Sequence, residues 1–274
     1  MEYRPGGVVR AVFFSPTGTT RTVVSLLART LAAELSAPLE SYDFTLPAAR
    51  ERIPPSGPLD VTVVGLPVYA GRLPNVLLPY LEQWEGRGAL AVPVVLFGNR
   101  NFDDALIELR DLLEQRGYHT LAGAAFVGEH AFSRTLAAGR PDSADLDQAQ
   151  RFARAVADKL RAGPFPTPAH VAGRQPVGPY YQPRDQAGAP IDIRKVKPTV
   201  DDRCDHCGRC AALCPMGSID PSDVTHYTGI CIKCGACIKG CPRGARGYDD
   251  PGYLYHKQEL ELGYARPAPI SLFL

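Results

Sequence analysis

The chain has 274 residues, of which 45% are hydrophobic and 22% are charged, and this composition is typical of a folded globular protein. A single hydrophobic core usually stops growing at about 250 residues, so we expect one mid-sized domain and one small domain. The net charge is +1, from 30 basic and 29 acidic residues, which argues against strong attraction to nucleic acid or to an anionic membrane. No apolar run reaches the roughly 18 residues of a membrane span, and Arg4 and Arg10 interrupt the only stretch that could mimic a signal peptide. We therefore expect a cytoplasmic protein.

The first 162 residues alternate between strand-like and helix-like segments. Residues 7–14 are apolar and rich in Val and Phe, as in a strand that is buried on both faces. After a polar turn, apolar residues recur at three- and four-residue spacing and predict a helix that packs one face on a sheet, namely Val23, Val24, Leu26, Leu27, Leu31 and Leu35. Further strands are expected at 38–44, 60–66, 89–98 and 120–128, and helices at 102–116 and 143–161. Because such alternation requires right-handed crossovers, residues 1–162 are predicted to form a doubly wound α/β domain with a five-stranded parallel sheet.

The composition changes after this domain. Residues 163–198 contain eight prolines and four glycines and show no helical or strand period. Their net charge is +3, but we favour a solvated linker over a docking patch. A cysteine-rich module follows at 199–248, and a tail at 249–274 ends in an apolar string that we expect to pack back on its own protein.

All eight cysteines lie within the module, between Cys204 and Cys241. In a chain without an export signal, cysteines at such spacing indicate metal ligands and not a set of disulfide bonds. The sequence C-x2-C-x2-C-x3-C-P occurs twice. Three thiolates on one tight loop can hold three irons of a 4Fe-4S cluster, while the fourth, followed by proline, reaches across to the other cluster. This crossover assigns one cluster to Cys204, Cys207, Cys210 and Cys241 and the second to Cys231, Cys234, Cys237 and Cys214.

Structural zinc is the alternative, since C-x2-C pairs also serve tetrahedral zinc sites. Zinc needs four ligands per ion and does not need the duplicated crossover, so the spacing favours iron–sulfur clusters. Residues 199–248 resemble bacterial two-cluster ferredoxins at every ligand position. The resemblance implies one-electron transfer at low potential. With six basic and five acidic residues, the module lacks the strongly acidic character of many such ferredoxins.

The turn after the first expected strand is rich in hydroxyl groups. It runs Ser15, Pro16, Thr17, Gly18, Thr19, Thr20 and falls at the carboxyl edge of the sheet, where open α/β folds bind ligands. Hydroxyls of Ser15, Thr17, Thr19 and Thr20, with the free amides of a helix start, can surround a phosphate, and Gly18 lets the backbone approach it. An ordinary turn in which Thr19 or Thr20 caps the helix is the alternative.

The pattern S-x-T-G-x-T after a first strand resembles the FMN-phosphate loop of flavodoxins, and the five-strand alternation resembles their fold. The resemblance implies that the loops after the third and fourth strands hold the flavin ring. Those loops read Pro67, Val68, Tyr69, Ala70, Gly71, Arg72 and Gly98, Asn99, Arg100, Asn101, Phe102. Tyr69 and Phe102 are the candidates for stacking on the ring, and Asn99 for polar contacts to its edge. Arg72 or Arg100 is expected to stabilise negative charge on the reduced flavin.

The sequence gives no sign of phosphoryl transfer, acyl transfer or nicotinamide binding. It has no Walker loop, no G-x-S-x-G elbow and no dinucleotide fingerprint placed after a strand. The whole chain resembles the flavodoxin and two-cluster ferredoxin fusions of anaerobic bacteria and archaea. This implies an electron-transfer protein that passes electrons between FMN and two 4Fe-4S clusters, with redox proteins as partners. One alternative is a ferredoxin-fed FMN reductase of a small-molecule acceptor, which an open pocket lined by Arg72, Arg100, Glu129 and His130 would favour. The other is a ferredoxin with an empty flavodoxin-like docking domain.

Overall fold

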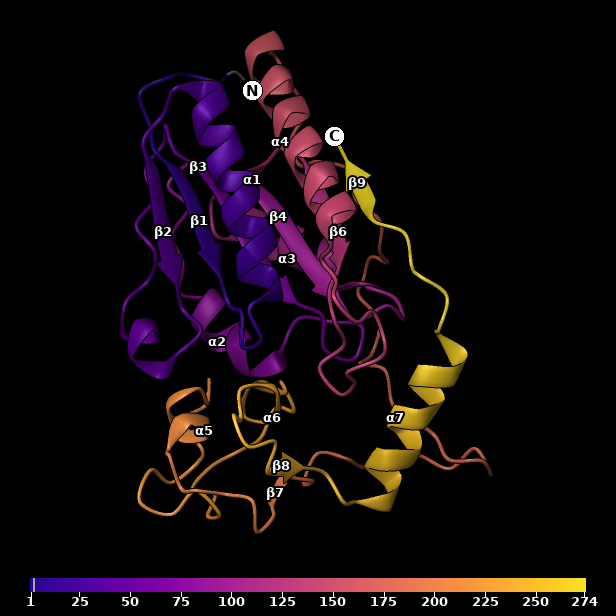
Figure 1. Cartoon of the computed structure of the whole chain (residues 1–274). Coiled ribbons are helices and arrows are strands. Elements are labelled where there is room, and N and C mark those ends of the chain that lie inside the picture. Colours follow the sequence, from indigo (N-terminus) through magenta and orange to yellow (C-terminus); the bar gives the residue numbers. More distant parts are fainter. Residues whose placement is uncertain (2) are drawn as a thin grey trace.

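The computed structural model describes residue 1 and residues 3–274, and its centre is a mainly parallel sheet (Figure 1). The strand order is β2-β1-β3-β4-β6-β9, and a short β5 pairs with β4. All pairs are parallel except β6 with β9. The strands span Val9–Phe13 (β1), Leu39–Asp43 (β2), Val61–Pro67 (β3), Leu90–Phe97 (β4), His119–Thr120 (β5), Gly123–Val127 (β6) and Ser271–Phe273 (β9).

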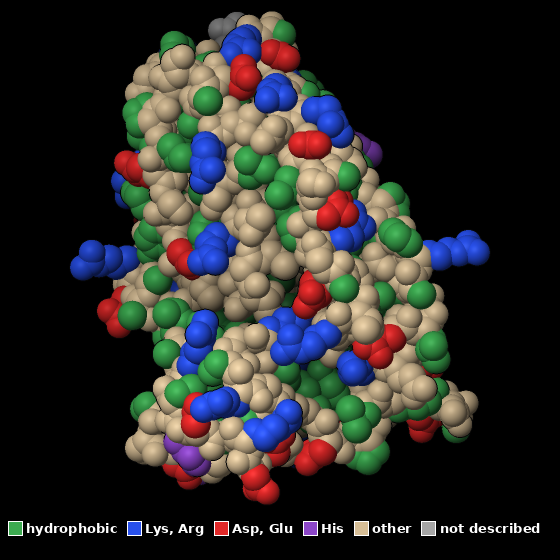
Figure 2. Space-filling model, viewed as in Figure 1, with side chains coloured by type: hydrophobic (Ala, Val, Ile, Leu, Met, Phe, Trp, Pro, Cys, Tyr) green, Lys and Arg blue, Asp and Glu red, His purple; other side chains and the backbone are tan. Residues whose placement is uncertain are grey.

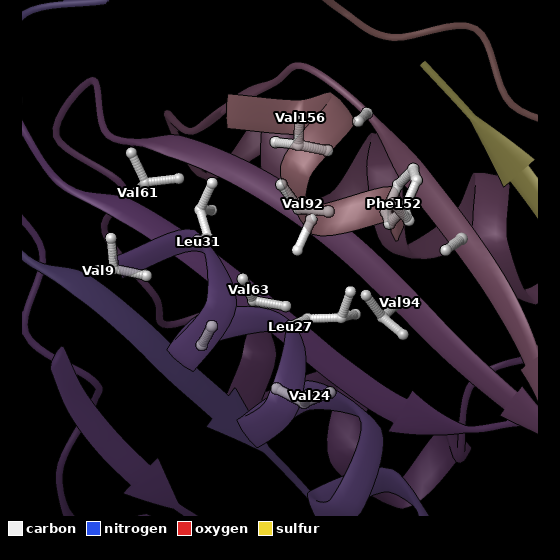
Figure 3. Packing of buried hydrophobic residues seen from close by; sticks show 14 of the residues in the cluster. Val9, Val24, Leu27, Leu31, Val61, Val63, Val92, Val94, Phe152 and Val156 are labelled. Atoms are coloured by element: carbon white, nitrogen blue, oxygen red, sulfur yellow. The ribbon is translucent and has the colours of Figure 1, made fainter. Parts of the chain in front are cut away.

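Helices cover both faces of the sheet. On one face lie α1 (Thr19–Leu35) and α4 (Ser143–Ala162), whose apolar stripes meet the inward-facing valines of β1, β3 and β4 (Figure 3). The other face packs against α3 (Ala105–Gln115) and the short segments η2 (Asn75–Leu77) and α2 (Leu78–Leu81). Each expected strand and both expected later helices therefore form. The structure confirms the predicted doubly wound α/β class.

Two features of the sheet differ from expectation. Only η2 and α2 stand between β3 and β4, because Pro67, Pro74 and Pro79 interrupt the segment. A seventh strand, β9, pairs antiparallel with β6 at the edge of the predicted five-stranded sheet. The apolar end of the chain thus packs back on its own protein, as expected.

The Pro-rich segment 163–198 is not a solvated coil throughout, and the expectation is wrong for its first half. Phe165 and Val171 are buried in the two cores, on opposite faces of the sheet. Asp104 accepts hydrogen bonds from the amides of Arg174 (2.9 Å) and Gly178 (2.8 Å). The segment wraps the α/β domain because buried apolar side chains and these bonds compensate for its lack of regular structure.

The cysteine module lies below the carboxyl edge of the sheet in Figure 1. It contains the short helices α5 (Arg209–Ala212) and α6 (Ala236–Lys239) and a ladder of β7 (Thr199–Val200) with β8 (Arg246–Gly247). Helix α7 (Pro251–Gly263) then leads back to β9; the remaining element, η1 (Pro47–Glu51), follows β2. Within the described residues, no helix is long and apolar enough to cross a membrane.

Candidate functional site

A cavity of about 710 Å³ lies at the carboxyl edge of the sheet, where open α/β folds bind ligands. Its walls come from the loops after β1, β3, β4 and β6, from the wrapping segment, from α7 and from the second cysteine run. This volume falls in the range of sites for small molecules and cofactors, about 300–1,000 Å³. The predicted loops are therefore brought together in one place, and the second cysteine run forms part of the same wall.

The hydroxyl loop contributes Pro16, Thr17, Thr19 and Thr20 to the cavity wall. Gly18 is the N-cap of α1 with φ 90°, a left-handed conformation that glycine adopts without strain, and no side chain caps the helix at this position. The alternative of a Thr19 or Thr20 cap is therefore wrong. The first amides of α1 have no intrahelical acceptors and lie beside these hydroxyls.

Ser15 and Gly18 do not line the cavity. The Ser15 hydroxyl instead accepts the amide of Arg21 at 2.9 Å, and the Ser15 amide donates to the Thr45 hydroxyl at 2.8 Å. Ser15 thus fixes the loop on the first turn of α1, while Gly18 supplies its backbone bend. Gly18 thus acts through its backbone, as predicted, and a contact of the Ser15 hydroxyl with a phosphate stays a prediction.

The loop after β3 is a tight turn closed by two backbone hydrogen bonds between Tyr69 and Arg72, at 2.9 and 3.1 Å. Pro67, Val68, Tyr69 and Ala70 line the cavity, but Gly71 does not. A Cβ at Gly71 would lie 2.3 Å from the Asp103 carboxylate, so glycine is needed there for close approach. Burial raises the pKa of the Tyr69 hydroxyl well above its usual value, and the neighbouring Cys234 and Cys231 add to the shift.

The loop after β4 sends only Gly98 and Arg100 to the cavity. The Asn99 side chain turns away from it, donates to the carbonyls of Tyr264 (2.6 Å) and Arg266 (2.9 Å), and accepts the Ala268 amide (2.9 Å). Phe102 packs on Phe97 in the core, with ring centroids 5.6 Å apart. The structure therefore corrects the predictions for both: Asn99 holds the C-terminal tail, and Phe102 completes the core.

The loop after β6 forms a further wall with Glu129, His130 and Phe132. Burial lowers the pKa of His130 to about 4, with a further contribution from Lys239, so the imidazole is neutral near pH 7. Its Nδ1 accepts the amide of Phe132 at 3.1 Å, which leaves the proton on Nε2. Gly98 allows this placement, because a Cβ there would lie 2.2 Å from the His130 ring.

Sequence reasoning missed the residues that cover the cavity. Tyr180 and Tyr181 from the wrapping segment and His256 from α7 line it. The Arg100 guanidinium lies 4.5 Å from the centre of the Tyr181 ring, and the Tyr180 hydroxyl donates to the Leu73 carbonyl at 2.9 Å. A pair of tyrosines within a stretch otherwise rich in proline was the only available signal.

The cysteines divide between two cavities. Cys231 and Cys234 line the large cavity, while Cys204, Cys207, Cys210 and Cys241 line a second, small one. The last cysteine of the second run therefore meets the first three of the first run. Within residue 1 and residues 3–274, no three His, Cys, Asp or Glu side chains group so as to hold a single metal ion.

Backbone amides and burial around the cysteines bear on whether their side chains can bind a metal as thiolates. Sulfur atoms accept backbone amides: Cys204 from His206 at 3.4 Å, Cys214 from Ser218 at 3.3 Å and Cys241 from Ala245 at 3.4 Å. Burial raises the pKa of Cys237 to about 12, with a smaller upward contribution from neighbouring thiols such as Cys231 and Cys214 and a downward one from Arg246. Because metal binding requires the thiolate, a bound metal would have to compensate for this shift at Cys237.

Comparison with known proteins finds one family model that matches part of the chain. Residues 201–217 and 228–245 match the 4Fe-4S binding domain, and no curated protein matches the chain. Similar solved structures include the rubredoxin oxygen:oxidoreductase of the anaerobe Desulfovibrio gigas, at 16% identity and a TM-score of 0.42. That match covers 58% of this chain but only 37% of the other. An archaeal flavodoxin is also similar, at 12% identity and a TM-score of 0.39, over 56% of this chain and 97% of that one. A Streptococcus pneumonia flavodoxin is similar at 19% identity and a TM-score of 0.38, over 57% of this chain and 99% of that one.

The strand order itself is decisive for the larger domain. The parallel strands β2-β1-β3-β4-β6 follow the flavodoxin-like order, with the hydroxyl loop at the β1/β3 switch point where that fold binds its ligand. The cysteine runs fall within the matched iron–sulfur segment. The chain therefore joins a flavodoxin-like α/β domain to a 4Fe-4S binding domain.

Proposed function

We propose that this protein transfers electrons between an FMN in the large cavity and two 4Fe-4S clusters in the cysteine module. The observation that carries the proposal is that one cavity is lined both by the hydroxyl loop and by Cys231 and Cys234. When bound, FMN exchanges two electrons in single steps, and each cluster carries one. The chain would thus connect two-electron and one-electron partners.

The residues fit a phosphate-bearing flavin. Thr17, Thr19 and Thr20 offer hydroxyls next to the free amides at the start of a 17-residue helix, which favour an anion. Tyr69 and Ala70 form the wall beside the second cysteine run, and the tyrosine ring offers a surface for an aromatic ligand. Of the predicted ring contacts, Pro67, Val68, Tyr69, Ala70, Gly98 and Arg100 therefore remain in the proposal.

The ligand sets proposed for the two clusters follow the crossover. The small cavity lined by Cys204, Cys207, Cys210 and Cys241 supports the first set. The second set is proposed on the cysteine spacing, and two of its members, Cys231 and Cys234, line the large cavity. Both sets keep three cysteines from one run and one from the other.

Cofactor content of the full chain, purified without oxygen, tests the proposal. We expect about eight irons, matching sulfide and one acid-released FMN per chain. Iron without FMN, even after reconstitution, would leave a ferredoxin with an empty flavodoxin-like docking domain. Zinc in place of iron would contradict the cluster assignment.

Paired substitutions test the crossover itself. Replacing Cys204 and Cys241 together by alanine is expected to remove only one cluster, because both belong to the same set. Replacing Cys231 and Cys241 together should remove both clusters, so that about eight irons are lost instead of about four. The reverse pattern of iron loss would show that each run holds its own cluster.

The side chains around the cavity favour a carrier over a reductase. Arg72 does not line the cavity, and its guanidinium is bound to Glu108 at 2.6 Å. Glu129 does line the cavity, but its carboxylate is paired with Lys239. Arg100 is paired with Asp103. A steady-state assay with reduced viologen and a panel of small-molecule acceptors is expected to show no turnover above that of free FMN; sustained turnover would favour the reductase.

A further inference from the structure

The small cavity has a buried cation in its wall. The cavity is lined by Cys204, Cys207, Cys210 and Cys241, which form the first ligand set proposed above, and by Arg246. Arg246 is only 5% exposed. In the part of the chain that the structure describes, no carboxylate pairs with it. An arginine is always charged in proteins, and burying its charge is costly unless a negative group lies nearby.

Neutral acceptors hold the two terminal nitrogens of this side chain. Nη1 of Arg246 donates to the Tyr227 hydroxyl at 2.8 Å, and Nη2 donates to the Val224 carbonyl. The Tyr227 hydroxyl in turn donates to the Pro198 carbonyl at 2.8 Å. The backbone is fixed as well, because Arg246 pairs with Val200 in the ladder of β7 and β8. The guanidinium therefore has a defined position beside the cysteines of the first set.

The third nitrogen of the guanidinium has no acceptor. Nε of Arg246 is buried, and among residue 1 and residues 3–274 no group accepts its hydrogen. A buried donor without a partner costs free energy, so we expect this one to meet a ligand in the cavity. Lys233 is the other buried cation of the module, but its Nζ donates to the carbonyls of Arg194 and Cys231, and it lines the large cavity. Of the two cations, Arg246 is the one with a donor left over.

We propose that Arg246 is the positive partner of the first ligand set and raises the reduction potential of the cluster held there. The inference rests on the proposed function, since it concerns a cluster proposed there. Four thiolates give such a cluster a net negative charge, and the one electron that it accepts makes this charge larger. Arg246 stabilises the reduced form more than the oxidised form, through its charge and through a hydrogen bond from Nε to a ligand sulfur.

Charged side chains on the surface of the module have a weaker effect on such a cluster. Figure 2 shows blue and red side chains together on the lower part of the molecule, where the module lies. Arg203 pairs with Asp201 at 2.6 Å and Arg243 with Asp205 at 2.9 Å, and all four residues are exposed. Water and salt screen exposed charges, whereas a buried charge such as that of Arg246 is screened much less.

A redox titration of the full, iron-loaded chain, followed by EPR, tests the proposal. The signal that disappears when Cys204 and Cys241 are both replaced by alanine identifies the first cluster. In Arg246→Gln, the ratio of reduced to oxidised first cluster at a fixed potential should fall about tenfold, which corresponds to about 59 mV for a one-electron couple. Arg246→Lys keeps the charge, and its ratio should stay within about threefold of wild type.

The second cluster serves as an internal comparison. Arg246 acts on its ligands through charge alone: burial raises the pKa of Cys237, and Arg246 counteracts this rise. The ratio for the second cluster should therefore change by less than about threefold in Arg246→Gln. A larger change at the second cluster than at the first would overturn the proposal, as would an unchanged first cluster.

Arg209→Gln is the matched control, because Arg209 lines the same small cavity but is exposed. It removes the same charge in the same way, and solvent screening should keep the change in the ratio below about twofold. Equal shifts of the first cluster in Arg209→Gln and Arg246→Gln would show that burial and the Nε donor have no special part, and would overturn the assignment to Arg246.

A measurement on the unmodified chain keeps the test decisive if Arg246→Gln does not fold. The chain is produced with arginine labelled with ¹⁵N at Nε and is then reduced. Pulsed EPR should detect a coupling between this nitrogen and the first cluster, and the coupling should persist in Arg209→Gln. A wild-type chain without the coupling would overturn the proposal.

Iron content separates this inference from the proposed function. Iron and sulfide are counted in every variant before the titration. A wild-type chain without clusters would contradict the proposed function and remove the inference with it. A chain that holds about eight irons, but whose first cluster does not respond to Arg246→Gln, would contradict the role of Arg246 alone. The titration follows the clusters directly, so it does not require bound FMN.

Discussion

The side chains of Thr17 and Thr20 line the cavity, while neighbouring residues of the same loop fix its backbone conformation. Gly18 turns the backbone at φ 90°, and the Ser15 hydroxyl accepts the Arg21 amide. The hydroxyls of the threonines are then available to a ligand at the start of α1. The same motif thus contains residues that shape the loop and residues that bind.

Thr17→Ala is expected to weaken FMN binding without weakening the fold. A hydrogen bond to a charged group contributes about 1.5–3 kcal/mol, so the Kd should rise by about ten- to a hundredfold. Thr22→Ala is the control, because the Thr22 hydroxyl donates to the Gly18 carbonyl and does not line the cavity. Fluorescence titration of the flavin-depleted chain measures both. An unchanged Kd for Thr17→Ala would remove this residue from the phosphate site.

His130 is expected to make stability depend on pH in a defined window. Its pKa is lowered to about 4 by burial, while an unfolded histidine titrates near 6.5. The unfolded chain therefore binds more protons between these values, so the contribution is complete above about pH 6.5 and is lost as the pH falls toward about 4. His130→Gln should flatten the fall of the thermal midpoint between about pH 6.5 and 5. An identical slope in both proteins would contradict the assignment.

The loop after β6 and helix α6 together fix the module on the flavodoxin-like domain. Lys239 pairs with Glu129 and donates to the His130 carbonyl at 2.7 Å. A Cβ at Gly235, which has φ 78°, would lie 2.6 Å from the Ala131 carbonyl oxygen. On the other side of the interface, Arg50 donates to the Pro215 carbonyl at 2.5 Å. These contacts bring Cys234 to the cavity wall.

Lys239→Met is expected to loosen the module while keeping both kinds of cofactor. It leaves the Glu129 carboxylate and the His130 carbonyl without their donor, at a cost of about 1–3 kcal/mol. Hydrogen exchange should rise in residues 128–135 and 235–240, and flavin reduction through the clusters should slow. Lys239→Arg should restore both properties, and Arg87→Met, which breaks an exposed pair with Glu85, should not affect them. Equal exchange in Lys239→Met and wild type would show that the ion pair is dispensable.

At the scale of the whole molecule, the first and last strands belong to one sheet although the cysteine module stands between them in the chain. Strand β9 pairs with β6 through Ser271 and its neighbours, and Phe273 packs against the core. The module is therefore held at both of its ends, through the wrapping segment and through α7 with the tail. This arrangement explains why the covering residues of the cavity come from both sides of the module in sequence.

Deletion of residues 270–274 is expected to lower stability and to expose the edge of β6. The loss of a three-residue ladder and the Phe273 contacts should cost about 1–3 kcal/mol, which corresponds to a few degrees in Tm for a chain of this size. An open edge also promotes self-association, so light scattering should increase with protein concentration. Leu272→Lys keeps the backbone ladder and replaces a side chain that is 40% exposed, and it should behave like wild type. A deletion with unchanged Tm would show that β9 contributes nothing to the fold.

The parts of this molecule that could be predicted from sequence are those with a local signal. The sheet follows from short apolar runs, and the cysteine spacing carries its chemistry within one loop. The partner of Asn99 could not be foreseen, because its acceptors Tyr264 and Arg266 lie at the far end of the chain. The cover formed by Tyr181 and His256 likewise depends on how a segment without a hydrophobic period wraps the domain. In each case the missing information is a long-range contact.

The place of β9 in the chain also has a consequence for biosynthesis. The ribosome makes residues 1–162 first, then the cysteine module, and only afterwards the strand that completes the edge of the sheet. Domains generally fold as they emerge, so the flavodoxin-like domain can fold before β9 is made. Until then, the edge of β6 has no partner strand while the cysteine module is being synthesised. Iron–sulfur assembly on the nascent chain would hold the module compact just before α7 and β9 arrive. Shortage of iron during translation should therefore increase aggregation of newly made chains, even though the cysteines lie outside the sheet.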